Sequence, residues 1–366
     1  MTVMEESEMA SLNDDVVAEI IVKLPLKSAA RSKCVSKKWR VAISGDPLLR
    51  RRLPLHMSAV YFPDDPARGG DGRPRVACAA AAGDCLLEDV GDLGSFFPFW
   101  EGAVVCDARN GLLLCRSPGT LRFYVANPVT RRWAALPAPA KDAQLSMLAF
   151  DPFSSPDHYH VVNFTGWRER GAAVEVFSSE ARAWSAHDPE FGVPVTALSA
   201  GSVHFHDGAV YILAFSDPGC LVRMDVAGGE CACTVVELPD EPVDGDGRVA
   251  HSGDRLHYVA IDGRGLLKVW TLEDSSPTRQ WQLKHAAKLD DVNKGGSNKV
   301  RLLGMHPEKD VVYMWSPWSI VEYDMAGRIS RAWELGKAEK GEKNRVVKTW
   351  HVPSSWYLSD CLVSRE

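Results

Sequence analysis

Two pairs of histidines offer the first candidates for chemistry in this 366-residue chain. His158 and His160 are separated by one residue, and so are His204 and His206. Alternate side chains of a strand point to the same face, so either pair could present two imidazoles to a metal ion. However, neither pair has an Asp, Glu or Cys at a diagnostic spacing, and the sequence HDG that starts at His206 is typical of a hairpin turn. We therefore interpret these histidines as exposed residues near turns, and we expect no metal site.

The acidic sequence DGDG at residues 244–247 suggests a calcium loop. An EF-hand loop that began at Asp244 would need an oxygen side chain at its fifth position and Glu at its twelfth. Arg248 and Arg255 occupy these positions, so the match fails. The sequences GxSxG and HExxH, a Walker loop and a dinucleotide-binding glycine pattern are all absent from the chain. We therefore expect no catalytic residues and no cofactor.

The composition is that of a folded protein, with 45% apolar and 25% charged residues. A net charge of −6 argues against nucleic acid or an anionic membrane as a partner. No apolar run approaches twenty residues, and the acidic start MTVMEESEMA does not resemble a signal peptide. The nine cysteines are odd in number and include no CxxC pair. Reduced cysteines in a cytoplasmic and/or nuclear protein are the simplest interpretation.

Residues 11–54 are predicted to form a small helical module. Asn13, Asp14 or Asp15 can cap a first helix, and Pro25 ends it. Apolar residues follow at helical spacing and predict one broad stripe: Val16, Val17, Ile20, Ile21 and Leu24. Three further short helices are expected to start at Ser28, at Ser36 and at Asp46-Pro47. The helix that starts at Ser36 is expected to end at Gly45. So small a module with several apolar faces is expected to dock on something else.

These residues resemble the F-box motif in order and spacing. The resemblance is carried by Leu12, Ile20, Leu24-Pro25, Ser28, Arg31, Val35, Lys38 and Trp39-Arg40. It implies binding to a Skp-type adaptor that bridges to a cullin ubiquitin ligase. The positions that it assigns to adaptor binding are Leu12, Asn13, Val16, Ile20, Leu24, Pro25, Val35 and Trp39. The sequence departs from the family pattern at Asn13, where Pro is frequent, and at Ala29-Ala30, where Leu is common. The alternative is a helical cap packed on the chain's own sheet.

Residues 55–366 are predicted to be all-β. Short alternating strands are separated by Gly, Pro, Asp and Asn, as in LRFYVANP, AAVEVFSS, GAVYILAF, RLHYVAI and LLKVWTL. Trp133 and Trp184 are 51 residues apart, and Trp281 and Trp333 are 52 apart. A repeat of about fifty residues with four strands is typical of a propeller blade. The length therefore predicts about six blades, five from visible hairpins and a sixth from residues 55–110. The charged stretch 336–348 is expected to be a loop.

This region resembles the kelch-like, F-box-associated β-propeller of plant F-box proteins. The matching sequences are NGLLLCR, NPVTRRWAALP, AFDPFSSPDHYHVV, VEVFSSEARAW and LKVWTLED, although a regular kelch double glycine is absent. The two resemblances imply a non-catalytic substrate-recognition subunit of an SCF (Skp–cullin–F-box) ubiquitin ligase. It would bridge a Skp-type adaptor, and a cullin through that adaptor, to an unknown target protein.

The target is expected to bind loops at one face of the propeller or its central opening. Aromatic and basic loop residues are the candidates for this contact: Trp167, Arg168, Trp315 and Trp318. Two alternatives remain open. One is a propeller enzyme or glycan-binding module with an incidental helical cap. The other is an F-box protein that binds the adaptor but acts outside ubiquitination, for example as a competitor.

Overall fold

The computed structural model describes residues 13–24, 28, 31–34, 37–45, 55–64, 75–79, 86–89, 93–117, 119–152, 154–155, 157–226, 230–239, 246–273, 280–289, 300–316, 319–326, 328–335, 343–353 and 362. The chain separates into two compact units. The first contains Met1–His56 with Val352–Asp360, and the second contains Met57–His351 with Cys361–Glu366. Each unit is described by itself below.

The first unit contains helices α1 (Asp14–Lys23) and α3 (Lys37–Gly45). Helix α1 begins as predicted, because the side chain of Asn13 accepts a hydrogen bond from the Asp15 amide at 3.4 Å. It ends before Leu24, whose extended backbone (ψ 138°) is the conformation that a following proline favours. A small core of Val17, Ile21 and Ile43 joins the two helices. The helix expected at Asp46-Pro47 lies outside the described residues.

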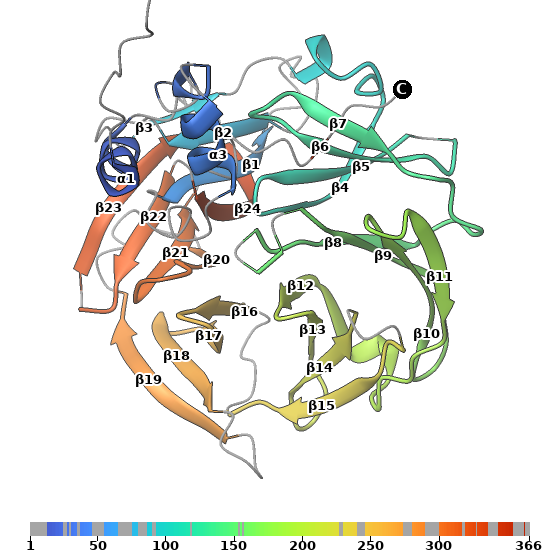
Figure 1. The fold of residues 1–366 in the computed structure, drawn as a ribbon. Helices are drawn as coiled ribbons and strands as arrows, with labels where there is room; N and C mark the ends of the chain where they lie inside the picture. Colours follow the sequence, from blue (N-terminus) through green and yellow to red (C-terminus); the bar gives the residue numbers. More distant parts are fainter. Residues whose placement is uncertain are drawn as a thin grey trace, which may run out of the picture. The chain divides into compact units, whose positions relative to one another are not determined.

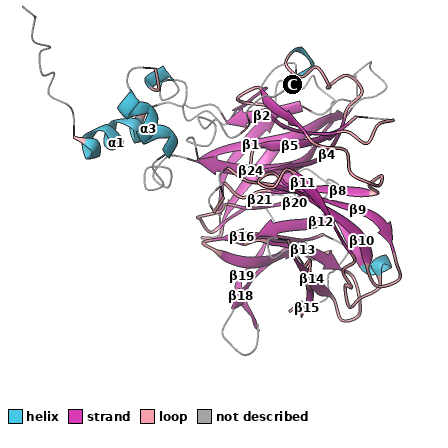
Figure 2. Ribbon diagram, turned by 45° about the vertical axis from the view of Figure 1, so that its right-hand side comes forward, coloured by secondary structure: helices cyan, strands magenta, loops and turns pink. Residues whose placement is uncertain are grey.

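The second unit is built almost wholly of strands (Figure 2). Its described strands form five sheets. The first contains β4 (Val104–Arg109), β5 (Leu112–Arg116), β6 (Phe123–Asn127) and β7 (Arg132–Ala135). The second contains β8 (Leu145–Ala149), β9 (His160–Trp167), β10 (Ala172–Ser178) and β11 (Ala183–His187). The third contains β12 (Leu198–His206), β13 (Ala209–Ala214), β14 (Cys220–Asp225) and β15 (Cys233–Glu237). The fourth contains β16 (Gly247–Ser252), β17 (Arg255–Ile261), β18 (Leu266–Glu273) and β19 (Gln280–Lys288).

The fifth sheet has eight strands and takes both ends of the β-region. In spatial order it contains β20 (Arg301–Met305), β21 (Val311–Ser316), β22 (Ser319–Asp324), β23 (Arg328–Leu335), β3 (Leu86–Asp89), β2 (Arg75–Ala79), β1 (Leu55–Asp64) and β24 (Lys343–Pro353). The structure also describes two short 3-10 turns, η2 (Leu93–Ser95) and η3 (Val195–Ala197). The first strand of each four-stranded sheet lies near the centre of the ring and the fourth lies at its rim (Figure 1). This arrangement is a β-propeller.

The expected number of about six blades is wrong, because the described strands form five sheets. The sequence spacing assigned residues 55–110 to a blade of their own. In the structure, β1 to β3 instead join the last hairpins through a parallel pairing of Glu334 with Leu86 and Leu335 with Leu87. Pairing between strands so distant in sequence leaves no local signal. The same sheet corrects the loop expected at 336–348, because Lys343–Pro353 forms β24 beside β1.

The core of the propeller lies between neighbouring sheets. Phe164 and Val174 of the second sheet pack with Val210 and Val222 of the third, and all four side chains are almost fully buried. A similar cluster joins the third and fourth sheets around Tyr258, which is 0% exposed. Strands that are buried on both faces need continuous apolar runs, which explains sequences such as AVYILA in β13. The strands that the sequence predicted in these runs are confirmed, but β13 is buried along its whole length instead of on alternate residues.

The regularly spaced tryptophans lie on the rim strands, where two of them connect consecutive sheets. The indole N–H of Trp184 on β11 donates to the Pro137 carbonyl oxygen at 2.8 Å, beyond the end of β7. The indole N–H of Trp281 on β19 donates to the Glu237 carbonyl oxygen at 2.7 Å, at the end of β15. Each bond joins a rim strand to the preceding sheet. Two of the four tryptophans that define the repeat of about fifty residues therefore connect consecutive sheets.

Replacing Trp281 by Phe should lower the free energy of unfolding by about 1 kcal/mol. The change keeps most of the ring that packs near Tyr258 but removes the N–H bonded to Glu237. Urea unfolding followed by circular dichroism measures the loss. Trp167→Phe is the matched control, because the indole N–H of Trp167 makes no hydrogen bond within the described residues. Equal stability of the Trp281→Phe variant and the unchanged protein would contradict a stabilising role for this bond.

Candidate functional site

Helix α1 divides the predicted apolar stripe into an inner and an outer row. Val17 and Ile21, four residues apart, are buried at 1% and 0% exposure. Val16 and Ile20 are also four residues apart, and they remain 44% and 36% exposed. The inner row holds α1 on α3 through the core with Ile43. The outer row has no such role within the described residues, so it is the part of the helix that is open to a partner.

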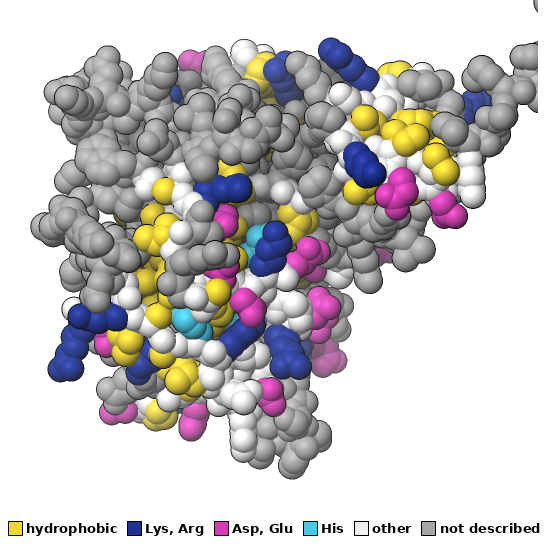
Figure 3. Space-filling model, turned by 90° about the vertical axis from the view of Figure 1, so that its left-hand side faces the viewer, with side chains coloured by type: hydrophobic (Ala, Val, Ile, Leu, Met, Phe, Trp, Pro, Cys, Tyr) yellow, Lys and Arg dark blue, Asp and Glu magenta, His cyan; other side chains and the backbone are white. Residues whose placement is uncertain are grey.

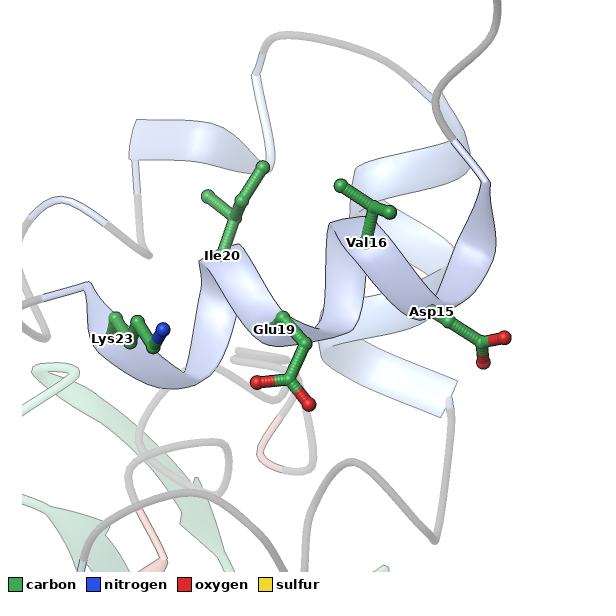
Figure 4. A pocket seen from close by; sticks show the side chains of 5 residues that line it. All are labelled: Asp15, Val16, Glu19, Ile20 and Lys23. Carbon is green, nitrogen blue, oxygen red and sulfur yellow. The ribbon is translucent and has the colours of Figure 1, made fainter.

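The outer row lines a hollow of about 240 Å³. All five lining residues come from α1: Asp15, Val16, Glu19, Ile20 and Lys23. Figure 4 shows Val16 and Ile20 side by side along the helix, with the charged ends of Asp15, Glu19 and Lys23 displaced from them. An apolar strip with charged groups at its margin has the general anatomy of a protein-binding surface. We call Val16 and Ile20, with these three charged residues, the α1 surface.

The other residues predicted to bind an adaptor differ in their surroundings. Asn13 is exposed and caps α1. Leu24 and Trp39 are half-buried and pack against the core of Val17, Ile21 and Ile43. Leu12, Pro25 and Val35 lie outside the described residues. The structure therefore brings Val16 and Ile20 together on an open surface, and the role of the whole set stays a prediction.

The residues predicted to bind a target also differ from one another in exposure and contacts. Trp167 is 39% exposed at the end of β9. Arg168 forms ion pairs with Asp188 at 3.3 Å and with Glu190 at 3.6 Å, all three side chains being well exposed. Trp315 is half-buried and packs against the cluster that contains Tyr313. Trp318 lies outside the described residues.

His158 is exposed and His160 is half-buried, whereas the pair His204 and His206 is placed differently from the sequence interpretation. The turn after β12 is confirmed, because Asp207 and Gly208 have positive φ angles of 44° and 70°. His204 and His206 are half-buried, however, and contact His251 on β16. His204 Nε2 lies 2.9 Å from His251 Nδ1, and the rings of His206 and His251 stack with centroids 4.7 Å apart. Sequence reasoning missed this contact, because His251 is 47 residues from His204.

Burial lowers the pKa of His251 to about 3, with the nearby His206 and Arg109 acting in the same direction. This imidazole is therefore neutral at pH 7, and its stacking joins the innermost strands of the third and fourth sheets. Among the described residues, no group of three or more His, Cys, Asp or Glu side chains could hold a metal ion.

Sequence reasoning also missed two exposed apolar side chains near Trp167. Phe215, just after β13, is 40% exposed, and Val235 on β15 is 44% exposed. The run AVYILAFSDPG predicts a buried strand followed by a turn, but it does not reveal which apolar residue remains exposed.

On the face drawn in Figure 3, basic and acidic side chains are interspersed among the coloured residues. No helix in the described part of the chain combines the length and apolar character needed to cross a membrane.

Comparison with known protein families gives two matches. The F-box domain model matches residues 9–51. The model described as "F-box protein At3g26010-like, beta-propeller" matches residues 93–330, which is well over half of the chain. The chain is an F-box protein of this β-propeller family.

Relatives of this F-box protein occur in Arabidopsis thaliana. It is 27% identical to F-box protein At5g07610 over 313 residues, which are 76% of this chain and 71% of the relative. It is 27% identical to putative F-box/kelch-repeat protein At4g22430 over 343 residues, 83% of this chain and 75% of the relative. It is 23% identical to F-box protein At3g26010 over 329 residues, 83% of this chain and 74% of the relative. The resemblance to plant F-box proteins with a propeller is confirmed.

Proposed function

We propose that this F-box protein is the substrate-recognition subunit of an SCF ubiquitin ligase. Residues 11–54 bind a Skp-type adaptor, which connects the chain to a cullin, and residues 55–366 bind a target protein. The protein itself performs no bond chemistry. It acts by proximity, because holding the target beside the ligase raises the effective concentration for ubiquitin transfer. A location in the cytoplasm and/or nucleus agrees with the reduced cysteines that the sequence predicts.

The observation that carries this proposal is the exposed pair Val16 and Ile20 within the segment that matches the F-box domain. Covering the exposed part of each side chain would contribute roughly 1 kcal/mol. The inner row, Val17 and Ile21, is occupied by the module's own core, so the outer row is available without unfolding. A few central apolar side chains commonly carry most of the binding energy of an interface.

Reconstituted ubiquitin transfer tests the proposal. The full chain is incubated with a purified Skp-type adaptor, a cullin with its RING subunit, the activating and conjugating enzymes, and ubiquitin. We expect ubiquitin conjugates on the F-box protein itself or on an added target that depend on the chain and on its F-box. A complex of chain and adaptor that excludes the cullin would contradict the ligase role and support a competitor.

A further inference from the structure

Two exposed apolar side chains, Trp167 and Phe215, lie at one end of the second and third sheets, and a third, Val235, lies on the rim strand β15. Trp167, Phe215 and Val235 are 39%, 40% and 44% exposed. We call these three residues the blade-end patch. Large apolar side chains of a folded protein are mostly buried, so three exposed ones around a single connection mark a candidate contact surface.

The topology explains why residues 48 and 20 positions apart in sequence converge. In antiparallel sheets, the β9–β10 turn, the β11–β12 connection and the β13–β14 turn lie at the same end. Direct hydrogen bonds tie them together: the Val195 amide donates to the Glu169 carbonyl at 2.9 Å, and the Phe215 amide donates to the Ala197 carbonyl at 2.8 Å. The β11–β12 connection therefore lies between Trp167 and Phe215.

Val235 belongs to the same surface. A Cβ atom placed on Gly192 would lie 3.1 Å from Val235 Cγ2, so this connection passes directly against β15. Gly192 has a φ of 74°, a conformation that glycine adopts without strain. The β11–β12 connection therefore lies against β15 through Gly192 and near Trp167 through Phe191.

Contacts with neighbouring aromatic rings fix the position of the Trp167 ring. Its ring stacks on buried Phe164, with centroids 5.1 Å apart and planes 13° apart, and Phe191 lies at 6.5 Å. A ring that is already fixed loses little rotational freedom when a partner covers it. Tryptophan with one face supported and the other exposed is the type of anchor that interface hot spots favour.

The charges around the blade-end patch favour a cationic partner. The connecting segments carry Glu169, Asp188, Glu190 and Asp217 against Arg168 and Arg170, a net charge of −2. Both guanidiniums bind internal acceptors. Arg168 pairs with Asp188 and Glu190, and Arg170 donates to the Gly192 carbonyl. Within the described part of the chain, Glu169 and Asp217 have no ion-pair partner.

We propose that the blade-end patch binds a segment of the target protein that carries Lys or Arg next to apolar side chains. The apolar side chains cover Trp167 and Phe215, and the cations face Glu169 and Asp217. The inference rests on the proposed function, because it names the class of target segment. It concerns the propeller unit alone and does not depend on the adaptor contact.

Fluorescence polarisation with three labelled peptides tests this inference on the full chain. One peptide alternates Lys with Leu, the second replaces each Lys by Glu, and the third replaces each Lys by Ser. We expect the Lys–Leu peptide to bind at least tenfold more tightly than the other two, with an affinity that falls as salt increases. Trp167→Asp and Phe215→Asp should each weaken it at least tenfold, although each adds a negative charge that would attract the peptide.

Leu283→Asp is the matched control, because Leu283 is 53% exposed on the rim strand β19 of another sheet. It should leave the affinity unchanged. Glu169→Gln with Asp217→Asn should reduce the salt dependence. Equal binding of all three peptides, no binding of the Lys–Leu peptide, or equal loss in the Leu283→Asp variant would overturn the proposal. Adaptor binding measured on the same preparations reports the proposed function separately.

Discussion

Replacing Ile20 by Asp should reduce the affinity for a Skp-type adaptor at least a hundredfold. Ile20 lies at the middle of the α1 surface and is 36% exposed beside Val16. A carboxylate at this position would lose its hydration when the partner covers it, which costs several kcal/mol. Because Ile20 points away from the core of Val17, Ile21 and Ile43, the helices should remain folded. Isothermal titration of the adaptor into the full chain measures the loss.

Two further variants make the Ile20 result specific. Ile20→Leu keeps the size and polarity of the side chain and should bind within a few-fold of the unchanged chain. Leu24→Asp should also lose binding, but Leu24 packs against the module's own core, so that variant would unfold the helices as well. Normal binding by Ile20→Asp would show that the adaptor uses another face of the module.

Lowering the pH from 7 to 4 should destabilise the propeller by several kcal/mol, and one buried histidine accounts for much of the loss. His257 is 0% exposed. Its Nε2 lies 3.3 Å from the Ser252 carbonyl oxygen and donates to it, and its Nδ1 lies 3.0 Å from the Thr271 hydroxyl and accepts from it. Burial, together with the charge of Lys284, lowers the pKa of His257 from 6.5 to about 4.

The sign of the effect follows from proton uptake. Between pH 6.5 and about 4 the unfolded chain binds a proton at His257 and the folded chain does not, so acid favours unfolding. The contribution is fully present above pH 6.5 and is lost as the pH falls toward 4, by about 3 kcal/mol for this one group. His306, 6% exposed, acts in the same direction because burial also lowers its pKa to about 4.

Urea unfolding at pH 7.5, 6, 5 and 4.5 measures this dependence. His257→Gln removes the titrating group, so the free energy of unfolding should fall less steeply with acid than in the unchanged chain. The exposed His158, changed to Gln, is the control and should leave the slope as it was. An identical slope in the His257→Gln variant would contradict the role assigned to this imidazole.

Local sequence features predicted much of the architecture. Asn13 and Pro25 predicted the limits of α1, and the alternating runs predicted β6, β10, β13, β17 and β18. The spacing of Trp133, Trp184, Trp281 and Trp333 indicated a blade repeat, because these residues lie on the fourth strands of the first, second and fourth sheets and on β23 of the fifth. These features depend on neighbours in sequence, so one chain is enough to reveal them.

The structural features that the sequence did not predict depend on contacts between residues that are distant in sequence. The pairing of Leu86 with Glu334, which joins two strand groups into one sheet, has no local sequence signal. The contact of His204 with His251 and the approach of Gly192 to Val235 arise only when neighbouring sheets close on each other. Helical spacing likewise predicted a single apolar stripe on α1. Packing of α3 was needed to separate the buried Val17 and Ile21 from the exposed Val16 and Ile20.

The central claim is that this chain connects a target to a ubiquitin ligase, and assembly of the complex tests it most directly. The full chain, a purified Skp-type adaptor and a cullin are mixed and separated by size-exclusion chromatography with light scattering. We predict a single species with one copy of each protein for the unchanged chain, and free F-box protein when Ile20 is replaced by Asp. Separate elution of the unchanged chain from the adaptor and cullin would contradict the account.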